Sequence, residues 1–162
     1  MKILVLCTGN SARSILLEAL LNRLEKGRIT AFSAGSNPTG AVHPQSLKLL
    51  GGKGYDLSGA RSKSWDEFAA PGAPELDIVI TVCASAAGEV CPIWPSTTPG
   101  KPLRAHWGVD DPAVADETDW QDAFQTAYDI LDRRAQALLD LPLEDMKADA
   151  MKTALDRIGT LP

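Results

Sequence analysis

Residues 2–24 constrain the fold more strongly than any other stretch of the chain. They read KILVL, then CTGNSARS, then a leucine-rich segment. The apolar run at 2–6 predicts a buried β-strand, and leucines recur after it at the spacing of one helix face, at positions 16, 17, 20, 21 and 24. Residues 7–14 therefore form a tight loop that leads from the end of a strand into the first turn of a helix.

The composition of this loop is that of an anion-binding site. Backbone N–H groups converge at a helix N-terminus, and the helix dipole favours negative charge there. Gly9 lets the backbone approach a ligand closely, Asn10 tolerates a left-handed turn, and Arg13 can bind two oxygens of an oxyanion with its planar guanidinium group. The predicted anion-binding residues are Thr8, Gly9, Asn10, Ser11, Ala12, Arg13 and Ser14.

Cys7 stands where the strand meets this loop. A thiol at a helix N-terminus near an arginine has a lowered pKa, so we expect a populated thiolate with the hydroxyls of Ser11 and Ser14 hydrogen-bonded to it. The spacing Cys-x5-Arg alone also occurs around buried structural cysteines. Its position directly after an apolar strand, with Gly-Asn-Ser inside it, favours a nucleophile at the floor of an oxyanion site.

Length and charge exclude several classes of protein. A chain of 162 residues suits one domain with its own core, and the net charge of −5 argues against nucleic acid as a partner. No segment approaches the roughly 18 apolar residues of a membrane span, and no apolar leader precedes the first strand. We therefore expect a cytoplasmic protein without a membrane partner.

The rest of the chain alternates between strand and helix patterns. Further strands are predicted at 29–33, 76–82 and 103–107, and further helices at 43–50, 65–68, 119–139 (with Asp119 as N-cap) and 143–158. His43 is expected to be an ordinary surface or helix-capping residue. Strands that alternate with helices indicate an α/β domain with a parallel sheet.

Two further cysteines, Cys83 and Cys91, raise the question of redox chemistry. Cys83 follows the strand at 76–82, so it should emerge at the same sheet edge as Cys7. An unbroken helix would hold Cys83 and Cys91 about 12 Å apart, beyond disulfide reach, but the small residues between them allow a loop that closes the gap. The alternative is two buried, inert thiols; the spacing does not suit zinc.

Three segments together carry a resemblance: KILVLCTGNSARS at the start, TVC…AGEVCPIWP at 81–95 and AHWGVDDPA at 105–113. They resemble the low-molecular-weight protein tyrosine phosphatase family and, within it, the thioredoxin-coupled arsenate reductases. The resemblance implies a single domain with a four-stranded parallel sheet in the order 2-1-3-4 and helices on both faces. It covers residues 1–140, with 141–162 as a C-terminal helical extension of the same domain.

The resemblance also implies a role for each cysteine. In that family the first cysteine attacks arsenate, the second releases arsenite by attacking the first, and the third forms a disulfide with the second that thioredoxin reduces. The matching positions are Cys7, Cys83 and Cys91. Asp111 matches the general acid that protonates the departing oxygen, while Asp110 is expected to face solvent. A turn-capping role is the alternative for Asp111.

The leading hypothesis is therefore a reductase that converts arsenate to arsenite in arsenic detoxification. It would use no tightly bound cofactor and an external thiol reductant, either thioredoxin or glutaredoxin with glutathione, and phosphate or sulfate would compete with arsenate. Ala12 stands where some relatives have a cysteine, and Ala84-Ser85 where they often have acidic or amide residues, which leaves the reductant open. Relatives also bind potassium beside the loop, and Asn10, Glu18 and Ser33 are the matching positions.

Two other functions remain open from the sequence. A phosphatase acting on tyrosyl or aryl phosphates needs only Cys7, Arg13 and Asp111, and a non-catalytic oxyanion-binding or redox-sensing protein needs the loop alone. Phosphatases of this family usually carry aromatic residues after the Asp-Pro pair to line a tyrosine slot. Here the residues are Ala113-Val114-Ala115, which favours a small inorganic substrate.

Overall fold

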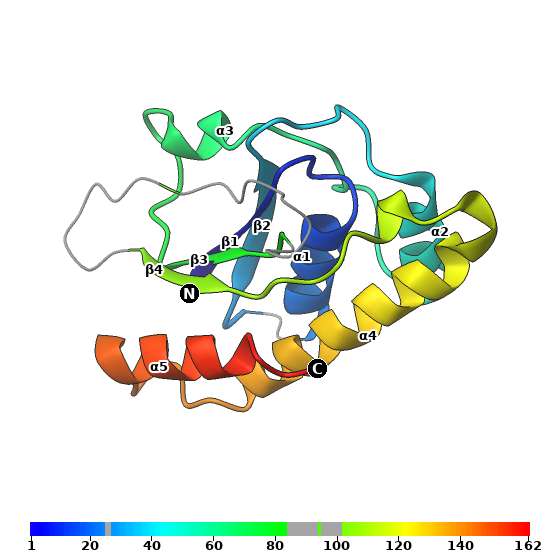
Figure 1. Ribbon diagram of the computed structural model, residues 1–162. Helices are drawn as coiled ribbons and strands as arrows, with labels where there is room; N and C mark the ends of the chain where they lie inside the picture. The colour runs from blue at the N-terminus through cyan, green and yellow to red at the C-terminus, as the bar shows by residue number, and fades with distance from the viewer. Residues whose placement is uncertain (25–26, 84–93, 95–101) are drawn as a thin grey trace.

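The computed structural model describes residues 1–24, 27–83, 94 and 102–162, and helices surround a central parallel sheet (Figure 1). The strands are β1 (Lys2–Cys7), β2 (Thr30–Gly35), β3 (Ile78–Thr81) and β4 (Leu103–His106). They form a 4-stranded sheet in the order β2-β1-β3-β4, and every pairing is parallel. The predicted fold class and strand order are confirmed.

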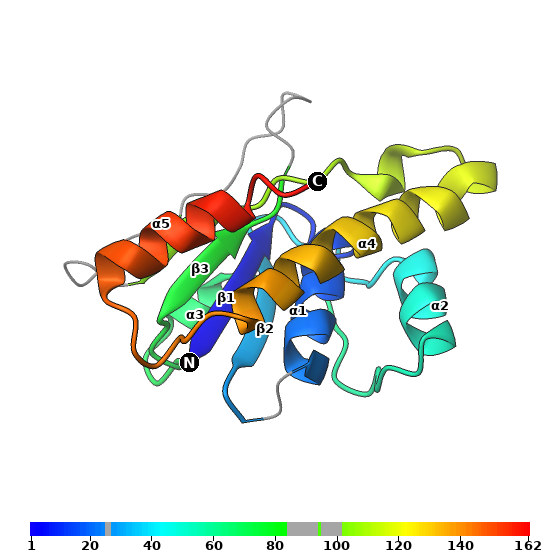
Figure 2. The same cartoon turned by 90° about the horizontal axis from the view of Figure 1, so that it is seen from below.

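The helices are unevenly divided between the two faces of the sheet. They are α1 (Arg13–Leu24), α2 (Pro44–Gly52), α3 (Asp66–Ala69), α4 (Trp120–Leu139) and α5 (Ala148–Ile158). Figures 1 and 2 show α1, α4 and α5 against one face and the short α3 on the other. None of the helices in the described part of the chain is long and apolar enough to cross a bilayer.

Strand β1 lies in the middle of the sheet and is buried on both faces. Ile3 and Val5 belong to the core beneath α1 and α4, whereas Leu4 and Leu6 belong to a second cluster on the opposite face, with Val79. Because side chains alternate along a strand, a shift by one residue would exchange the two sets. The packing of β1 therefore places Cys7 at the carboxyl end of the central strand.

The start of α4 differs in detail from the prediction. The helix begins at Trp120, as expected for an N-cap at Asp119. Asp119 instead closes a 3-10 turn (Glu117–Asp119) with helical backbone angles, and its side chain makes no capping hydrogen bond. The preceding turn leads the chain into the helix, so the carboxylate cap is not required.

The C-terminal helix begins later than the predicted residue 143. The N–H of Asp145 donates to the carbonyl of Pro142 at 2.9 Å, which makes a turn there, and α5 begins only at Ala148. The buried side of the helix also differs from the prediction. Met151, Leu155 and Ile158 face the core, while the predicted apolar residue Ala150 is exposed.

Candidate active site

The anion loop (residues 8–14) connects β1 to α1, and its carbonyl groups are held on the outside. The N–H groups of Ser36, Asn37, Thr39 and His43 donate to the carbonyls of Cys7, Thr8, Gly9 and Ser11 at 3.2, 3.0, 3.0 and 2.9 Å. In a trans peptide the N–H points away from the carbonyl oxygen. The loop N–H groups are therefore directed inward, toward the side where the Cys7 sulfur lies.

Two residues allow the loop to take this shape. Asn10 has a φ of 45°, in the left-handed region that the sequence predicted for it. Gly35, at the end of β2, runs so close to the loop that a Cβ there would lie 2.5 Å from the carbonyl oxygen of Thr8. A side chain at position 35 would therefore push the loop away from the sheet.

The thiol of Cys7 is almost fully enclosed, with 3 % of the residue exposed. Its Sγ lies 2.9 Å from Oγ of Ser14 and accepts the N–H of Asn10 at 3.1 Å. Burial raises the pKa of Cys7 above its ordinary value, and the Ser14 hydrogen bond, the Asn10 N–H and the charge of Arg13 only partly oppose it. The expected lowering of this pKa is wrong for this arrangement, because desolvation outweighs the local field.

Ser11 was expected to contact the sulfur as well, and within the described residues its side chain does not. Its carbonyl oxygen instead accepts the Ser46 hydroxyl at 3.0 Å, which ties the loop to α2. Of the two predicted serine contacts, the structure has only the one from Ser14. Ala12, the remaining loop residue, is buried in the core beside α1.

Arg13 reaches across from the start of α1 to the loop that follows β4. Its Nη2 lies 2.9 Å from Oδ2 of Asp111, and its Nη1 donates to the carbonyl of Val109 at 2.9 Å. The ion pair partly neutralises the guanidinium charge before any anion enters. The charge of Arg13 still lowers the pKa of Cys7, but the desolvation of the buried sulfur is the larger effect.

Asp111 faces the anion loop and also caps a turn. Its Oδ1 accepts the N–H of Ala113 at 3.1 Å, at the start of the 3-10 turn Pro112–Val114. The turn-capping alternative is therefore confirmed for Oδ1, while Oδ2 contacts Arg13 and the general-acid role stays a prediction. Asp110 is exposed, as predicted, and Val114 has 82 % of its surface exposed, so it presents a small apolar side chain to solvent beside Asp111.

Cys83 lies at the same sheet edge as Cys7 and is completely buried. The N–H of Val82 donates to the carbonyl of Leu6 at 2.9 Å, which joins two neighbouring strands at this edge. Cys83 directly follows Val82, and Cys7 directly follows Leu6. The sequence predicted this edge for both thiols. Cys91, together with Ala84-Ser85, lies outside the described residues.

The three predicted potassium-binding residues also lie together, and the structure adds a lysine to them. Oγ of Ser33 donates to Oε2 of Glu18 at 2.5 Å, and Nδ2 of Asn10 donates to Oγ of Ser33 at 2.9 Å. Nζ of Lys63 lies 3.6 Å from Oε2 of Glu18. Sequence reasoning missed Lys63, because nothing in its local pattern distinguishes it from a surface lysine.

Burial acts in opposite directions on the two charged groups of this cluster. It raises the pKa of the Glu18 carboxyl, against the effect of Lys63 and Ser33. It lowers the pKa of the Lys63 ammonium, against the attraction of Glu18. Each group thus offsets part of the desolvation of the other, as expected for a buried ion pair.

His43 has the helix-capping role that the sequence allowed. Its Nδ1 accepts the N–H of Gln45 at 3.1 Å at the start of α2, and its ring packs against Trp120 and Phe124. Burial lowers the pKa of His43, and the nearby charge of Asp111 opposes this. The residue therefore connects α2 to the start of α4 beside the Asp111 loop.

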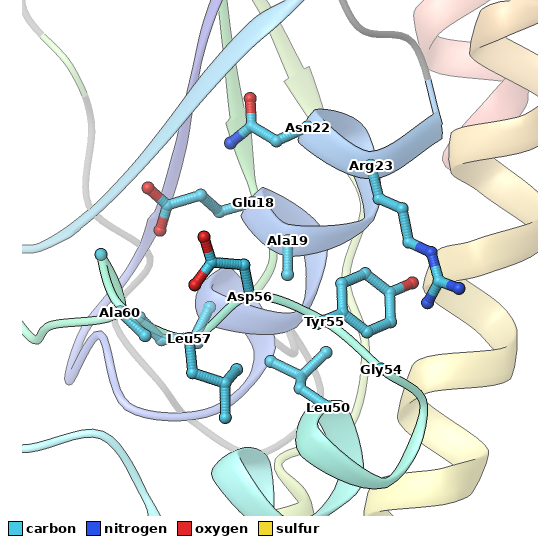
Figure 3. A pocket seen from close by; sticks show the side chains of 12 residues that line it. Glu18, Ala19, Asn22, Arg23, Leu50, Gly54, Tyr55, Asp56, Leu57 and Ala60 are labelled. Carbon is cyan, nitrogen blue, oxygen red and sulfur yellow. The ribbon is translucent and has the colours of Figure 1, made fainter.

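A pocket of about 500 Å³ opens on the flank of α1, away from the sulfur. Figure 3 shows it between α1 and the segment that follows α2, with Glu18, Asn22 and Arg23 from the helix and Tyr55 and Asp56 opposite. It reaches the carboxylate of Glu18 and none of the anion-loop residues. The flank pocket is therefore a solvent path to the Glu18 cluster.

A comparison with known protein families identifies the family of this chain. Residues 2–152 match the sequence model of the low molecular weight phosphotyrosine protein phosphatases. The chain belongs to this family. Such a match over most of the chain agrees with the strand order and with the position of the anion loop between the central strand and its helix.

Family members with similar sequences are named as arsenate reductases. The chain is 38% identical over 114 residues to an arsenate reductase of Halalkalibacterium halodurans, covering 70% of this chain and 76% of that protein. It is 36% identical over 114 residues to an arsenate reductase of Bacillus subtilis, with the same shares covered.

Solved structures with a similar fold include arsenate reductases and a tyrosine phosphatase. The arsenate reductase from Archaeoglobus fulgidus has a TM-score of 0.63 and 25% identity, covering 83% of this chain and 98% of that one. A thioredoxin-dependent arsenate reductase of Corynebacterium glutamicum has a TM-score of 0.60 and 26% identity, covering 85% of this chain and 59% of that one. A tyrosine phosphatase from Erwinia amylovora, at 20% identity and a TM-score of 0.58, shares the fold.

Proposed function

We propose that this member of the phosphatase family reduces arsenate to arsenite with Cys7 as the nucleophile. The observation that carries the proposal is the enclosed Cys7 thiol in the anion loop, with Arg13 and Asp111 beside it, in a chain 38% identical to an arsenate reductase. The loop N–H groups and the Arg13 guanidinium would bind the arsenate oxygens. Arg13 would then exchange its contact with Asp111 for one with the substrate.

The first chemical step forms a bond between sulfur and arsenic. Once released from Arg13, the Asp111 carboxylate can accept the proton of the Cys7 thiol, and the thiolate attacks arsenic. The same carboxyl group then passes the proton to an arsenate hydroxyl, which leaves as water. The raised pKa of Cys7 in the free protein fits this order, because the thiol keeps its proton until substrate displaces Asp111.

The reduction itself would follow by exchange between thiols. The Cys83 thiolate attacks the Cys7 sulfur, the S–As bond breaks with its electron pair left on arsenic, and arsenite departs. Cys91 then attacks Cys83, which releases Cys7 and leaves a Cys83–Cys91 disulfide. An external dithiol, thioredoxin in our proposal, reduces that disulfide, and no tightly bound cofactor takes part. A structural relative described as thioredoxin-dependent supports this choice.

One experiment tests the order of these steps. After a single arsenate turnover without reductant, peptide mapping by mass spectrometry should find a Cys83–Cys91 disulfide in the wild type. Cys83→Ser should stall with arsenic on Cys7, and Cys91→Ser should stall one step later, as a Cys7–Cys83 disulfide. Normal arsenate turnover by both variants, with no disulfide in the wild type, would contradict the relay.

Aryl phosphate hydrolysis separates the reductase from the phosphatase alternative. Hydrolysis needs the anion loop and Asp111 and neither of the later cysteines, so Cys83→Ser and Cys91→Ser should leave it unchanged. Cys7→Ser should abolish hydrolysis and arsenate reduction alike, because a hydroxyl is not ionised at neutral pH. Arsenite formation with thioredoxin, compared with glutaredoxin and glutathione, identifies the reductant.

A further inference from the structure

The oxygen atoms that would hold a potassium ion beside the anion loop are already engaged. Oδ1 of Asn10 accepts the main-chain N–H of Lys63 at 2.8 Å. Oγ of Ser33 accepts from Asn10 and donates to Oε2 of Glu18. A hard cation needs several oxygen ligands that converge on one point. The oxygen atoms of these three side chains are instead used in hydrogen bonds to one another and to the main chain of Lys63.

The ammonium group of Lys63 lies in the middle of this cluster. Its Nζ is 3.6 Å from Oε2 of Glu18, 3.4 Å from Oγ of Ser33 and 3.4 Å from the carbonyl of Arg61. The Lys63 side chain is 6% exposed and the Glu18 side chain 20%. Lysine is rarely this deeply buried unless an acidic group pairs with it, as Glu18 does here.

The main chain holds Lys63 in place from both sides. Its N–H donates to Asn10, in the anion loop, and its carbonyl accepts the N–H of Gly35, at the end of β2, at 2.9 Å. The same contacts that attach segment 61–64 to the sheet therefore fix the main chain of Lys63, and the contacts of Nζ with Glu18, Ser33 and Arg61 place its ammonium group.

We propose that Lys63 is the internal cation of this protein and takes the place that potassium has beside the anion loop of relatives. A potassium ion bound between Glu18 and Ser33 would lie next to the ammonium charge and be repelled by it. The donor atoms present do not fit the metal while Lys63 is in position. The protein should therefore need no monovalent metal ion.

The internal cation acts on the reactive sulfur through Asn10. The Nδ2 group of Asn10 also donates to Oγ of Ser14 at 2.9 Å, and that oxygen lies 2.9 Å from Sγ of Cys7. Hydrogen bonds thus run from the Glu18–Lys63 pair through Ser33 and Asn10 to the nucleophile. Lys63 is a positioning residue, since it holds the loop without touching the anion.

Thermal unfolding of the wild type provides the first test, and it does not depend on the enzymatic reaction. Melting temperatures should be equal in potassium chloride and in choline chloride at the same ionic strength. A saturable rise in melting temperature that is specific to potassium would overturn the inference.

Lys63→Met, with Lys48→Met on the exposed face of α2 as its matched control, provides the second test. Loss of the buried partner of Glu18 should lower the melting temperature by roughly 10 °C in choline chloride. Potassium can reach Glu18 through the flank pocket and should restore part of this loss (Figure 3). Lys48→Met should show neither effect. A Lys63→Met variant that behaves like Lys48→Met in either respect would overturn the inference.

A double variant keeps the test decisive if Lys63→Met does not fold. Lys63→Met with Glu18→Gln removes the buried negative charge as well, so it should fold and melt alike in both salts. A double variant that fails to fold, or that still responds to potassium, would show that Lys63 does something other than neutralise Glu18.

Discussion

Two ion pairs lie beside the anion loop, and they differ in length and in the exposure of their acidic side chains. Arg13 and Asp111 meet at 2.9 Å with side chains 4% and 32% exposed, whereas Lys63 and Glu18 meet at 3.6 Å with 6% and 20% exposed. The basic group is buried in both. The acid of the first pair lies at the solvent edge, and the acid of the second accepts a further hydrogen bond from Ser33.

The difference corresponds to the roles that we propose for the two pairs. In the proposed mechanism Arg13 leaves Asp111 to bind an oxyanion, and water can solvate a carboxylate that is 32% exposed, which lowers the cost of the exchange. In our proposal Lys63 stays in place and holds the loop, and breaking a buried pair costs about 3–5 kcal/mol. We infer that the first pair opens in each turnover and that the second stays closed.

Arg13→Lys should have the largest effect on activity, because it changes the basic group of the pair that we infer opens in each turnover. An ammonium group can still pair with Asp111 but cannot bind two arsenate oxygens at once. We expect kcat/KM for arsenate to fall by roughly 10³–10⁵, as for other arginines that stabilise a transferring oxyanion. Initial rates of arsenite formation measure this, with the exposed Arg61→Lys as control. A variant that keeps more than a tenth of the wild-type rate would contradict the role of Arg13.

Asp111→Asn should separate anion binding from proton transfer, because it frees Arg13 from its ion pair while it removes the proposed proton donor. Turnover should fall by roughly 10²–10⁴, the usual share of a general acid. Sulfate binding, measured by calorimetry, should be retained or become tighter, since a negative charge beside the loop is gone. Asp110→Asn is the control and should be silent. If Asp110→Asn is the damaging change instead, the general acid is Asp110 and not Asp111.

Ser14→Ala tests the link between the loop and the sulfur with a smaller effect. The hydrogen bond from Ser14 favours the thiolate, so its loss should raise the pKa of Cys7 further. The pH dependence of iodoacetamide labelling, in a Cys83→Ser and Cys91→Ser background, should move to higher pH. An unchanged or lower midpoint would show that the hydroxyl does not stabilise the thiolate.

The raised pKa of Cys7 also implies that the stability of the protein depends on pH. Burial raises the pKa of the Cys7 thiol in the folded protein. The stability that the protonated thiol contributes is therefore complete below the pKa that this thiol has in the unfolded chain. That contribution is lost as the pH rises through the folded-state pKa. Wild type should therefore lose more stability than Cys7→Ser in this alkaline range, measured by urea unfolding. Parallel curves for the two proteins would be the opposite result.

Truncation after Asp140 should have the smallest effect on activity, because it touches neither ion pair. Helix α5 buries Leu155, whose carbonyl accepts the indole N–H of Trp107 at 2.9 Å. Removing residues 141–162 should leave arsenate turnover unchanged and lower the free energy of unfolding by about 3 kcal/mol or more, from lost apolar burial and from two donors, the indole N–H of Trp107 and Nε of Arg134, that lose their acceptors. Loss of oxyanion binding in a folded, truncated protein would mean that the C-terminal segment contributes to the site.

Much of the fold follows from local patterns. Leu16, Leu20 and their neighbours specify α1, and the apolar runs specify the strands to within a few residues. The order of the strands came from resemblance, because parallel pairing depends on which strands meet in space. The late start of α5 was missed because the turn at Pro142 competes with an apolar spacing that also fits a helix.

The sequence by itself determined the anion loop, because strand, loop and helix are contiguous and the conformation of Asn10 is a local property. Only the tertiary structure decided which charges meet. Arg13 and Asp111 are 98 positions apart, and Lys63 reaches Glu18 only because its main chain pairs with Gly35. It also decided the direction of the Cys7 pKa shift, since a sequence pattern shows nearby dipoles and charges but not how much water the fold removes from the sulfur.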